Sequence, residues 1–460
     1  MLLNKKNVFS SYIFIFVMLF LIISMFKETT ISNLSGIVMF TFILNGFVIF
    51  IRLLKSSKLG YSLSNIIDMF MFAFMFLAPI IQYVNKTFPW DNASLITDRA
   101  VVITNFIILI FLAIYYFFYD QFTAKYKKST KKITLVNFIN VRLMLDIGFI
   151  ISLIAGSYIF FVTGFTNLFA RSTNSLGLDG TTSLVVNNFL KGFPMTTLLM
   201  NIVYWQNNKK FYNKFQALVL LIITVLLNFP TGNPRFQVAV IYLGLLIAVK
   251  QKFNNKYFFK YLLFIGLFII FPLLNIFRNN TFSDLAALNV TVSKPVDDFL
   301  TGNYDSYSML TRSIIYGSIS GTTLGGQLLG SILFFVPRSI WPNKPIGSGA
   351  FIAKSLGWDF TNVSMPYIGE GYINFGLLGV ILFSIVLAFI TSTLDYKHER
   401  IIEERLYEKV SFISVVYPIM IGFIFFIMRG DLLSSLSFTI GSGILPIITL
   451  LAIDKLCSLK

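Results

Sequence analysis

The sequence predicts an all-α polytopic membrane protein with about twelve transmembrane helices. Its 460 residues are 56% hydrophobic and only 12% charged, and a soluble domain cannot cover that much apolar surface. Apolar stretches of about 17 to 23 residues recur along the chain and match the thickness of the hydrocarbon layer of a bilayer. Short basic links separate these stretches, which is typical of a chain that crosses a membrane many times.

Hydropathy divides residues 1–460, taken as one membrane domain, into helices in chain order. The first apolar stretch has no small-residue cleavage pattern before Lys27, so we expect a retained span rather than a signal peptide. The predicted helices start near residues 8, 31, 62, 99, 143, 186, 215, 235, 258, 371, 409 and 432.

The basic residues predict the orientation. Most of them lie in the links at 5–6, 52–58, 125–132, 209–214, 250–260 and 397–409, and at the C-terminus. By the positive-inside rule these links and both termini are cytoplasmic, which accounts for the net charge of +17 without a nucleic-acid partner. The single cysteine, Cys457, excludes an internal disulfide and a cysteine-based metal cluster.

One outer segment, residues 278–370, precedes the last three predicted helices and is far longer than an ordinary connection. Residues 327–337 within it are apolar but too few to cross a bilayer, so we expect an interfacial or re-entrant element. The next stretch, PRSIWPNKPIGSG, carries Arg338, Trp341 and Lys344 on a loop stiffened by three prolines. Two interpretations stay open for it, a binding role and simple helix termination with Trp341 at the membrane interface.

The stretch NFPTGNPRFQ places an arginine, Arg235, at the centre of an apolar run between Lys214 and Lys250. Its prolines and glycine break the helix, so the run predicts a hairpin whose turn lies near the outer surface. Arg235 is then about 22 Å from the inner boundary. A charge facing lipid costs roughly 2.5 to 3.5 kcal/mol, so we expect Arg235 to point into a protected wet cavity.

Further arginines reach the outer side by independent counting. Arg278 lies 18 residues after Lys260 and Arg429 lies 20 residues after Lys409, which gives rises of about 27 and 30 Å. The others on this side are Arg171, Arg312 and Arg338. Snorkelling at a helix end is the alternative for each one alone. Together, guanidinium groups placed against the positive-inside bias predict a diphosphate-binding site at the outer leaflet.

Four stretches, GNPRFQVAVI, FFVPRSIWPNKP, YIGEGYINFGLLG and FIMRGDLLSS, resemble the Wzy-type bacterial oligosaccharide repeat-unit polymerases that build O-antigens and capsules. The similarity in layout covers nearly the whole chain. It implies a fold like that of the lipid-dependent, GT-C-like glycosyltransferases, in the bacterial plasma membrane with the active site facing outward. The implied reaction transfers a growing glycan from undecaprenyl diphosphate to another carrier-linked unit. A flippase and a chain-length regulator of the same pathway are implied partners.

The implied reaction requires that the negative charge on the departing diphosphate be stabilised. The outer side has no D-x-D pattern and no cluster of His, Cys and Asp, so we predict a metal-independent, arginine-assisted transfer without a cofactor. The predicted catalytic residues are Arg235, Arg338 and Glu370. The residues predicted to bind the diphosphate and glycan are Arg171, Arg278, Arg312, Trp341, Lys344, Arg429 and Asp431.

Two acidic residues are assigned to this site. Glu370 is the predicted catalytic base, and a helix-start carboxylate stabilised by the helix dipole is the equal alternative. Asp431 is predicted to orient Arg429, with local turn formation as its alternative.

Three other polar residues are expected to lie outside the chemistry. His398 is predicted to be a solvated residue of a charged cytoplasmic link, and Asp305 a polar loop residue. Asp68, inside the third predicted helix, is a functional candidate by position, although a hydrogen bond to Asn65 is the simpler account.

Two further functions stay open at this point. A flippase for lipid-linked oligosaccharide would also need many helices and a cationic cavity, but it predicts two related halves, and the chain shows none. An O-antigen ligase-like transferase shares the chemistry of the polymerase.

Overall fold

The computed structural model is all-helical over the residues that it describes, with one isolated β-bridge between Asn137 and Ser411. The described residues are 35–55, 57–129, 135–164, 168–169, 180–207, 211–229, 232–233, 235–270, 295–404 and 410–459. The first predicted span, near residue 8, lies outside them.

Seven helices in the described part are long and apolar enough to cross a membrane, which confirms the predicted helical membrane class. They are α2 (Gly36–Leu54), the continuous run α3 (Leu63–Phe72), η1 (Ala73–Leu77) and α4 (Ala78–Val84), α5 (Asp98–Lys128), α6 (Val141–Thr163), α18 (Tyr367–Glu403), α19 (Phe412–Arg429), and the run α20 (Leu432–Phe438), η7 (Thr439–Ile444) and α21 (Leu445–Ser458). Between α6 and α18 the chain adds α7 (Gly180–Asn207), α8 (Phe211–Leu227), α9 (Arg235–Val249), and α10 (Phe258–Ile265) continued by η4 (Gly266–Ile270).

Several links predicted to share one side meet, in their described parts, at one end of the bundle, here called the basic end. Lys58, which follows α2, pairs with Glu399 near the end of α18 at 2.9 Å. The Asp454 carboxylate of α21 accepts the backbone N–H of Asn140, just before α6, at 2.8 Å. Backbone hydrogen bonds between Phe138 and Val410 and between Phe412 and Val136 connect these two regions, so the links at 52–58 and 397–404 and the C-terminal residues lie at the same end. That this end is cytoplasmic stays a prediction.

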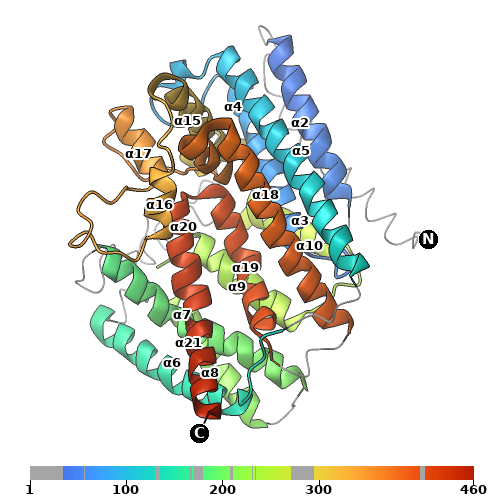
Figure 1. The fold of residues 1–460 in the computed structure, drawn as a ribbon, viewed down its shortest axis with the longest axis vertical. Coiled ribbons are helices and arrows are strands. Elements are labelled where there is room, and N and C mark those ends of the chain that lie inside the picture. The colour runs from blue at the N-terminus through green and yellow to red at the C-terminus, as the bar shows by residue number, and fades with distance from the viewer. Residues whose placement is uncertain are drawn as a thin grey trace, which may run out of the picture.

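The opposite end, here called the loop end, carries the described part of the long segment before α18. It contains α14 (Pro295–Phe299), η5 (Gly302–Tyr304), α15 (Ser306–Ser320), α16 (Gly326–Ile332) and α17 (Ser348–Ser355). Figure 1 shows α15 and α17 at one end of the bundle and the C-terminus of α21 at the other.

Helix α15 packs into the bundle although it belongs to the predicted outer segment. Residues 306–314 are all buried. The Tyr307 hydroxyl donates to Asn105 of α5 at 3.0 Å, and Thr311 bonds Thr104 at 3.1 Å. Polar side chains thus attach this helix to a spanning helix, and the loop end is fixed to the bundle.

Helices α9 and α19 pack antiparallel and in close contact. Gly244 lies against the carbonyl of Pro418, and Gly422 lies against Val240. Close approach of two backbones through small residues is the usual device for joining helices in a membrane. At one end of the pair, Phe236 stacks on Phe426 with ring centroids 3.6 Å apart.

A single added methyl group is expected to disrupt this helix pair. In Gly422→Ala the new Cβ would lie 2.2 Å from the Val240 Cα, so the helices must separate, and we expect a loss of about 1 to 3 kcal/mol in the free energy of unfolding. Gly36→Ala is the matched control, because nothing lies within 4 Å of its Cβ. Unfolding by dodecyl sulfate in mixed micelles measures both, and equal midpoints would contradict the tight α9–α19 contact.

The prediction for His398 was wrong. His398 lies within α18, is 4% exposed, stacks on Tyr417 with centroids 3.8 Å apart and lies 2.9 Å from the Tyr61 hydroxyl. The charged run around it is not a loop, because α18 continues to Glu403 and keeps one face against its neighbours.

Asp68 has a structural hydrogen bond, but its partner differs from the predicted one. The Tyr116 hydroxyl of α5 donates to Asp68 at 2.9 Å, in place of the expected contact with Asn65. The Arg52 guanidinium lies over the Tyr116 ring at 4.2 Å, so a cation stands close to this buried acid.

Candidate functional site

The antiparallel pair of α9 and α19 brings two predicted arginines to the loop end. Arg235 begins α9 and Arg429 ends α19, and the Phe236–Phe426 stack places these two helix ends at the same level. The described part includes the backbone of Arg235 but not its side chain, and Arg171 and Arg278 lie outside the described residues.

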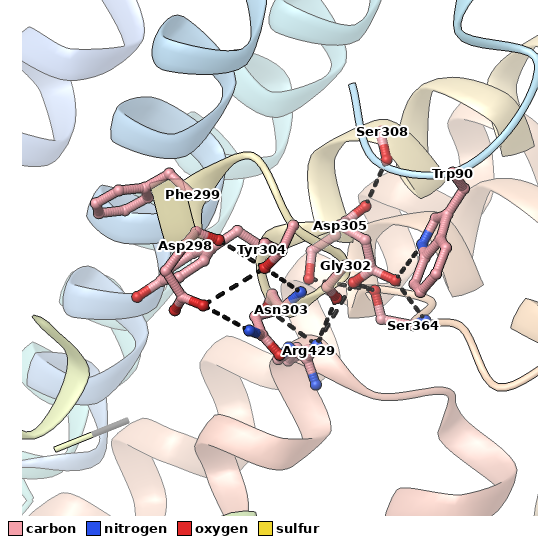
Figure 2. A network of polar contacts seen from close by, with 12 residues as sticks. Trp90, Asp298, Phe299, Gly302, Asn303, Tyr304, Asp305, Ser308, Ser364 and Arg429 are labelled. Carbon is pink, nitrogen blue, oxygen red and sulfur yellow. Dashed lines mark hydrogen bonds and ion pairs between the residues drawn. The ribbon is translucent and has the colours of Figure 1, made fainter. Parts of the chain in front are cut away.

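Arg429 belongs to a polar network built around a buried acid (Figure 2). Its Nη2 lies 3.5 Å from Asp305, which is 1% exposed. The Asp305 carboxylate also accepts the Trp90 indole N–H at 2.8 Å, the Ser364 backbone N–H at 3.1 Å and the Ser364 hydroxyl at 2.5 Å. Asp305 is therefore a central acceptor of the loop end rather than the polar loop residue that the sequence predicted.

The turn before α15 orients Arg429 within this network. Arg429 donates to the carbonyls of Gly302 and Asn303 at 3.3 and 3.0 Å, and the Asn303 amide donates to Asp298 at 2.7 Å. A Cβ on Gly302 would lie 2.2 Å from the Trp90 ring, so only glycine lets the turn approach the indole. Six side chains from four separate segments thus depend on one another: Trp90, Asp298, Asn303, Asp305, Ser364 and Arg429.

Arg312 joins the same network through Trp90 but faces inward. It is 1% exposed and donates to the carbonyls of Trp90 and Asp91 at 3.4 and 2.9 Å. Its guanidinium lies over the Trp358 ring at 5.0 Å, and burial lowers the pKa of Arg312 to about 10. The arginine, itself in α15, joins the 90–91 loop to Trp358 just after α17, so the structure places it behind the exposed surface.

Glu370 is fully buried in the first turn of α18. One carboxylate oxygen accepts the Ser348 hydroxyl and the other accepts the backbone N–H of Leu432, both at 2.7 Å. The acid therefore connects α17, α18 and α20. Because both oxygens are enclosed, neighbouring residues must move before a substrate can reach Glu370.

Asp431 does not orient Arg429, and this prediction was wrong. Its carboxylate caps α20 by accepting the backbone N–H and the hydroxyl of Ser434 at 2.9 and 3.0 Å. The acidic partner of Arg429 is Asp305. Gly430, between Arg429 and Asp431, has an extended backbone with φ −83° and ψ 162°. The helix therefore ends there, and the side chains of Arg429 and Asp431 point in different directions. The alternative of local turn formation is the one observed.

Arg338 and Lys344 hold the proline-rich loop in place through hydrogen bonds to backbone carbonyls of the loop and of the residues just before it. Arg338 donates to the Lys344 carbonyl at 2.7 Å, and the Lys344 ammonium donates to the carbonyls of Phe334 and Val336 at 2.5 and 3.1 Å. Burial and the nearby Arg338 charge lower the pKa of Lys344. Trp341, half-buried, lies within the turn that these cations close.

A polar cluster at the turn between α8 and α9 escaped the sequence analysis. The Lys191 ammonium of α7 donates to Asn233 at 3.1 Å, and Gln237 donates to Asn228 at 2.9 Å. Lys191, Asn228, Gln237 and Ser442 line a cavity of about 10 Å³, which is room for about one water. The signal available in the sequence was the lone lysine in the apolar stretch NNFLKGFPM, since charges at membrane depth are usually functional.

The site thus brings together Arg429, the start of α9, Lys191, the buried acids Asp305 and Glu370 and the half-buried Asp431, with the Arg338 loop close by through Gly347, which lies against Asp431. Among the described residues no three His, Cys, Asp or Glu side chains gather as a metal site requires. Comparisons with protein-family models, curated proteins and solved structures gave no match to this chain.

Proposed function

We propose that the protein polymerises undecaprenyl-diphosphate-linked oligosaccharide repeat units at its loop end. The observation that carries the proposal is the register of α9 and α19, which places the start of α9 at Arg235 beside the Arg429 end of α19. Lys191 adds another cation at the α8–α9 turn. Cations at this position suit a lipid-borne diphosphate, which guanidinium groups bind through paired hydrogen bonds.

The proposed orientation puts the basic end in the cytoplasm and the loop end outside a bacterial plasma membrane. In this proposal the shorter apolar helices 214–227, 236–249 and 258–270, together with α7 and the segment before residue 35, complete about twelve spans. The fold would then belong with the GT-C-like lipid-dependent glycosyltransferases. A long segment packed onto one end of the bundle supports this assignment, because it provides a fixed platform for two glycan substrates.

The proposed reaction balances without a further reactant. A hydroxyl of the acceptor unit attacks the anomeric carbon of the growing chain, and the bond from that carbon to the diphosphate breaks. The electron pair leaves with undecaprenyl diphosphate, whose charge the arginines stabilise. Glu370 takes the proton of the attacking hydroxyl once Ser348 has moved aside.

The direct test supplies purified protein in lipid vesicles with a synthetic undecaprenyl-diphosphate oligosaccharide and no added metal. We expect a ladder of longer glycans on a gel, unchanged by a chelator. Loss of the ladder on chelation would overturn the metal-independent reaction. No ladder, together with transfer of the lipid between leaflets, would replace the polymerase by the flippase.

Arg235→Lys is expected to lower the polymerisation rate by about tenfold or more, because a point charge replaces a two-pronged donor and one charged hydrogen bond is lost. Arg99→Lys is the matched control, since Arg99 is an exposed arginine at the same end, in the first turn of α5. Initial rates of ladder formation measure both variants. Equal rates would remove Arg235 from the site.

A further inference from the structure

Helix α18 is broken near its start, and another segment of the chain bonds the carbonyls that the break leaves without helical partners. Phe375 and Gly376 have non-helical backbone angles, with φ of +62° at Gly376. The carbonyls of Ile373 and Asn374 therefore lose their helical partners, and they accept the backbone N–H groups of Thr323 and Gly325 at 2.9 and 3.2 Å. The segment before α16 thus completes the hydrogen bonding of a spanning helix.

Backbone N–H groups of the same segment find acceptors on α18 and within the segment itself. The Asn374 side-chain oxygen accepts the backbone N–H of Leu328 at 2.9 Å, in the first turn of α16. The Gly326 N–H donates to the Thr323 carbonyl at 2.9 Å. Irregular backbone enters a membrane only where such groups have partners, and the N–H groups of Thr323, Gly325, Gly326 and Leu328 have them.

The outward face of the segment is apolar. Leu324 is 84% exposed, and its backbone lies in the left-handed region with φ of +50°. The left-handed conformation costs a leucine roughly 1 to 2 kcal/mol, and in this strained conformation the apolar side chain faces outward. Leu329, Ile332 and Phe335 are also about half exposed or more.

This apolar face continues onto the exposed face of α18. Phe375 contacts Gly325, so Leu324 lies next to the helix at the level where the exposed Leu377 and Leu378 begin. The apolar run of α18, residues 372–391, is about 30 Å long, and the break lies about one turn inside it. The segment therefore stands at the depth at which α18 itself would meet hydrocarbon.

We propose that residues 321–335 form a re-entrant segment, here called the wedge, which enters the hydrocarbon layer and is hydrogen-bonded to the broken helix α18. In this proposal Leu324, Leu329, Ile332 and Phe335 contact lipid acyl chains. The sequence left open whether this stretch lies on the surface or re-enters the membrane. The wedge is independent of the proposed polymerase activity, because it follows from backbone hydrogen bonds and exposed apolar side chains alone.

Site-directed fluorescence tests the wedge in the full-length protein. In a Cys457→Ser background, which removes the single native cysteine, Leu324, Leu329 and Phe335 are each replaced by cysteine and labelled with a bimane fluorophore. The proteins are reconstituted into phosphatidylcholine vesicles whose acyl chains carry a nitroxide quencher near the headgroup. Leu378→Cys, exposed on α18 at the level of the segment, and Asn343→Cys, exposed on the following loop, are the matched controls.

We expect lipid quenching at the three wedge positions to equal that at Leu378 and to exceed that at Asn343 severalfold, while aqueous iodide quenches only Asn343. Iodide quenching at Leu324 without lipid quenching would place the segment in water and overturn the proposal. Protection from both quenchers would show that another protein surface covers it, and would overturn the proposal equally.

Discussion

Replacing Arg429 by methionine is expected to lower the free energy of unfolding by about 2 to 3 kcal/mol. The change removes the cation that faces Asp305, whose carboxylate is 1% exposed and cannot be hydrated. The loss stays below the full penalty of an unpaired buried charge, because the Trp90 and Ser364 donors still hold the carboxylate. Methionine keeps most of the volume of the arginine side chain, so packing contributes little to the change in the free energy of unfolding.

Asp305→Asn is expected to lower the free energy of unfolding further, by about 3 to 5 kcal/mol. An amide has one acceptor oxygen, which cannot accept from all the donors that now bond the two carboxylate oxygens. The double variant Arg429→Met/Asp305→Asn should be more stable than the sum of the single losses implies, by about 1 to 3 kcal/mol. Unfolding in mixed micelles provides all four free energies. Arg99→Met, at an exposed position, is the control for loss of an arginine, and strictly additive losses would show that Arg429 and Asp305 do not interact.

The positions of the helices could be predicted because their causes are local. A helix predicted to start near residue 235 begins at Arg235, and one predicted near 432 begins at Leu432, because apolar length and a preceding proline or glycine define such ends. Where a charged run does not end a helix, local reasoning failed. The run around His398 remains helical because neighbours from α19 and the α2–α3 link cover one face of it.

The partners of the site residues could not be predicted, because they come from distant parts of the chain. Trp90 and Asp305 are 215 positions apart, and nothing near either residue indicates the other. Asp431 was assigned to Arg429 by proximity in sequence, yet the backbone at Gly430 turns it toward Ser434. Charge type and approximate depth are encoded locally, whereas the pairing of charges depends on the completed helix packing.

Lys191 illustrates an intermediate case. Its charge inside an apolar stretch was visible in the sequence, but its value as a site residue depends on Asn233 of the α8–α9 turn, which the fold brings within 3.1 Å. Arg235 begins the helix that follows the same turn. The nearness of a lysine and an arginine along this hairpin is the structural reason for proposing an anionic substrate.

Glu370→Gln is expected to lower the polymerisation rate by about 10²- to 10⁴-fold while costing less than about 1.5 kcal/mol in stability. Glutamine retains the shape and one acceptor for the Leu432 N–H, and its amide can donate to the Ser348 hydroxyl. It cannot take a proton from an acceptor sugar. The variant therefore separates the base from the helix-start carboxylate, the two roles that the sequence left open.

Two controls make the result interpretable. Asp98→Asn neutralises another acid in the first turn of a helix at the loop end, and it should leave the rate of ladder formation unchanged. Glu370→Ala also removes both acceptors and leaves a cavity, so it should lose about 3 kcal/mol or more in addition to activity. If Glu370→Gln polymerises at the normal rate, Glu370 serves only to join α17, α18 and α20, and the proton of the acceptor hydroxyl must go elsewhere. If instead the Gln and Ala variants lose stability equally, the carboxylate charge itself holds Ser348 and Leu432 in place, and loss of activity in either variant would then report folding rather than chemistry.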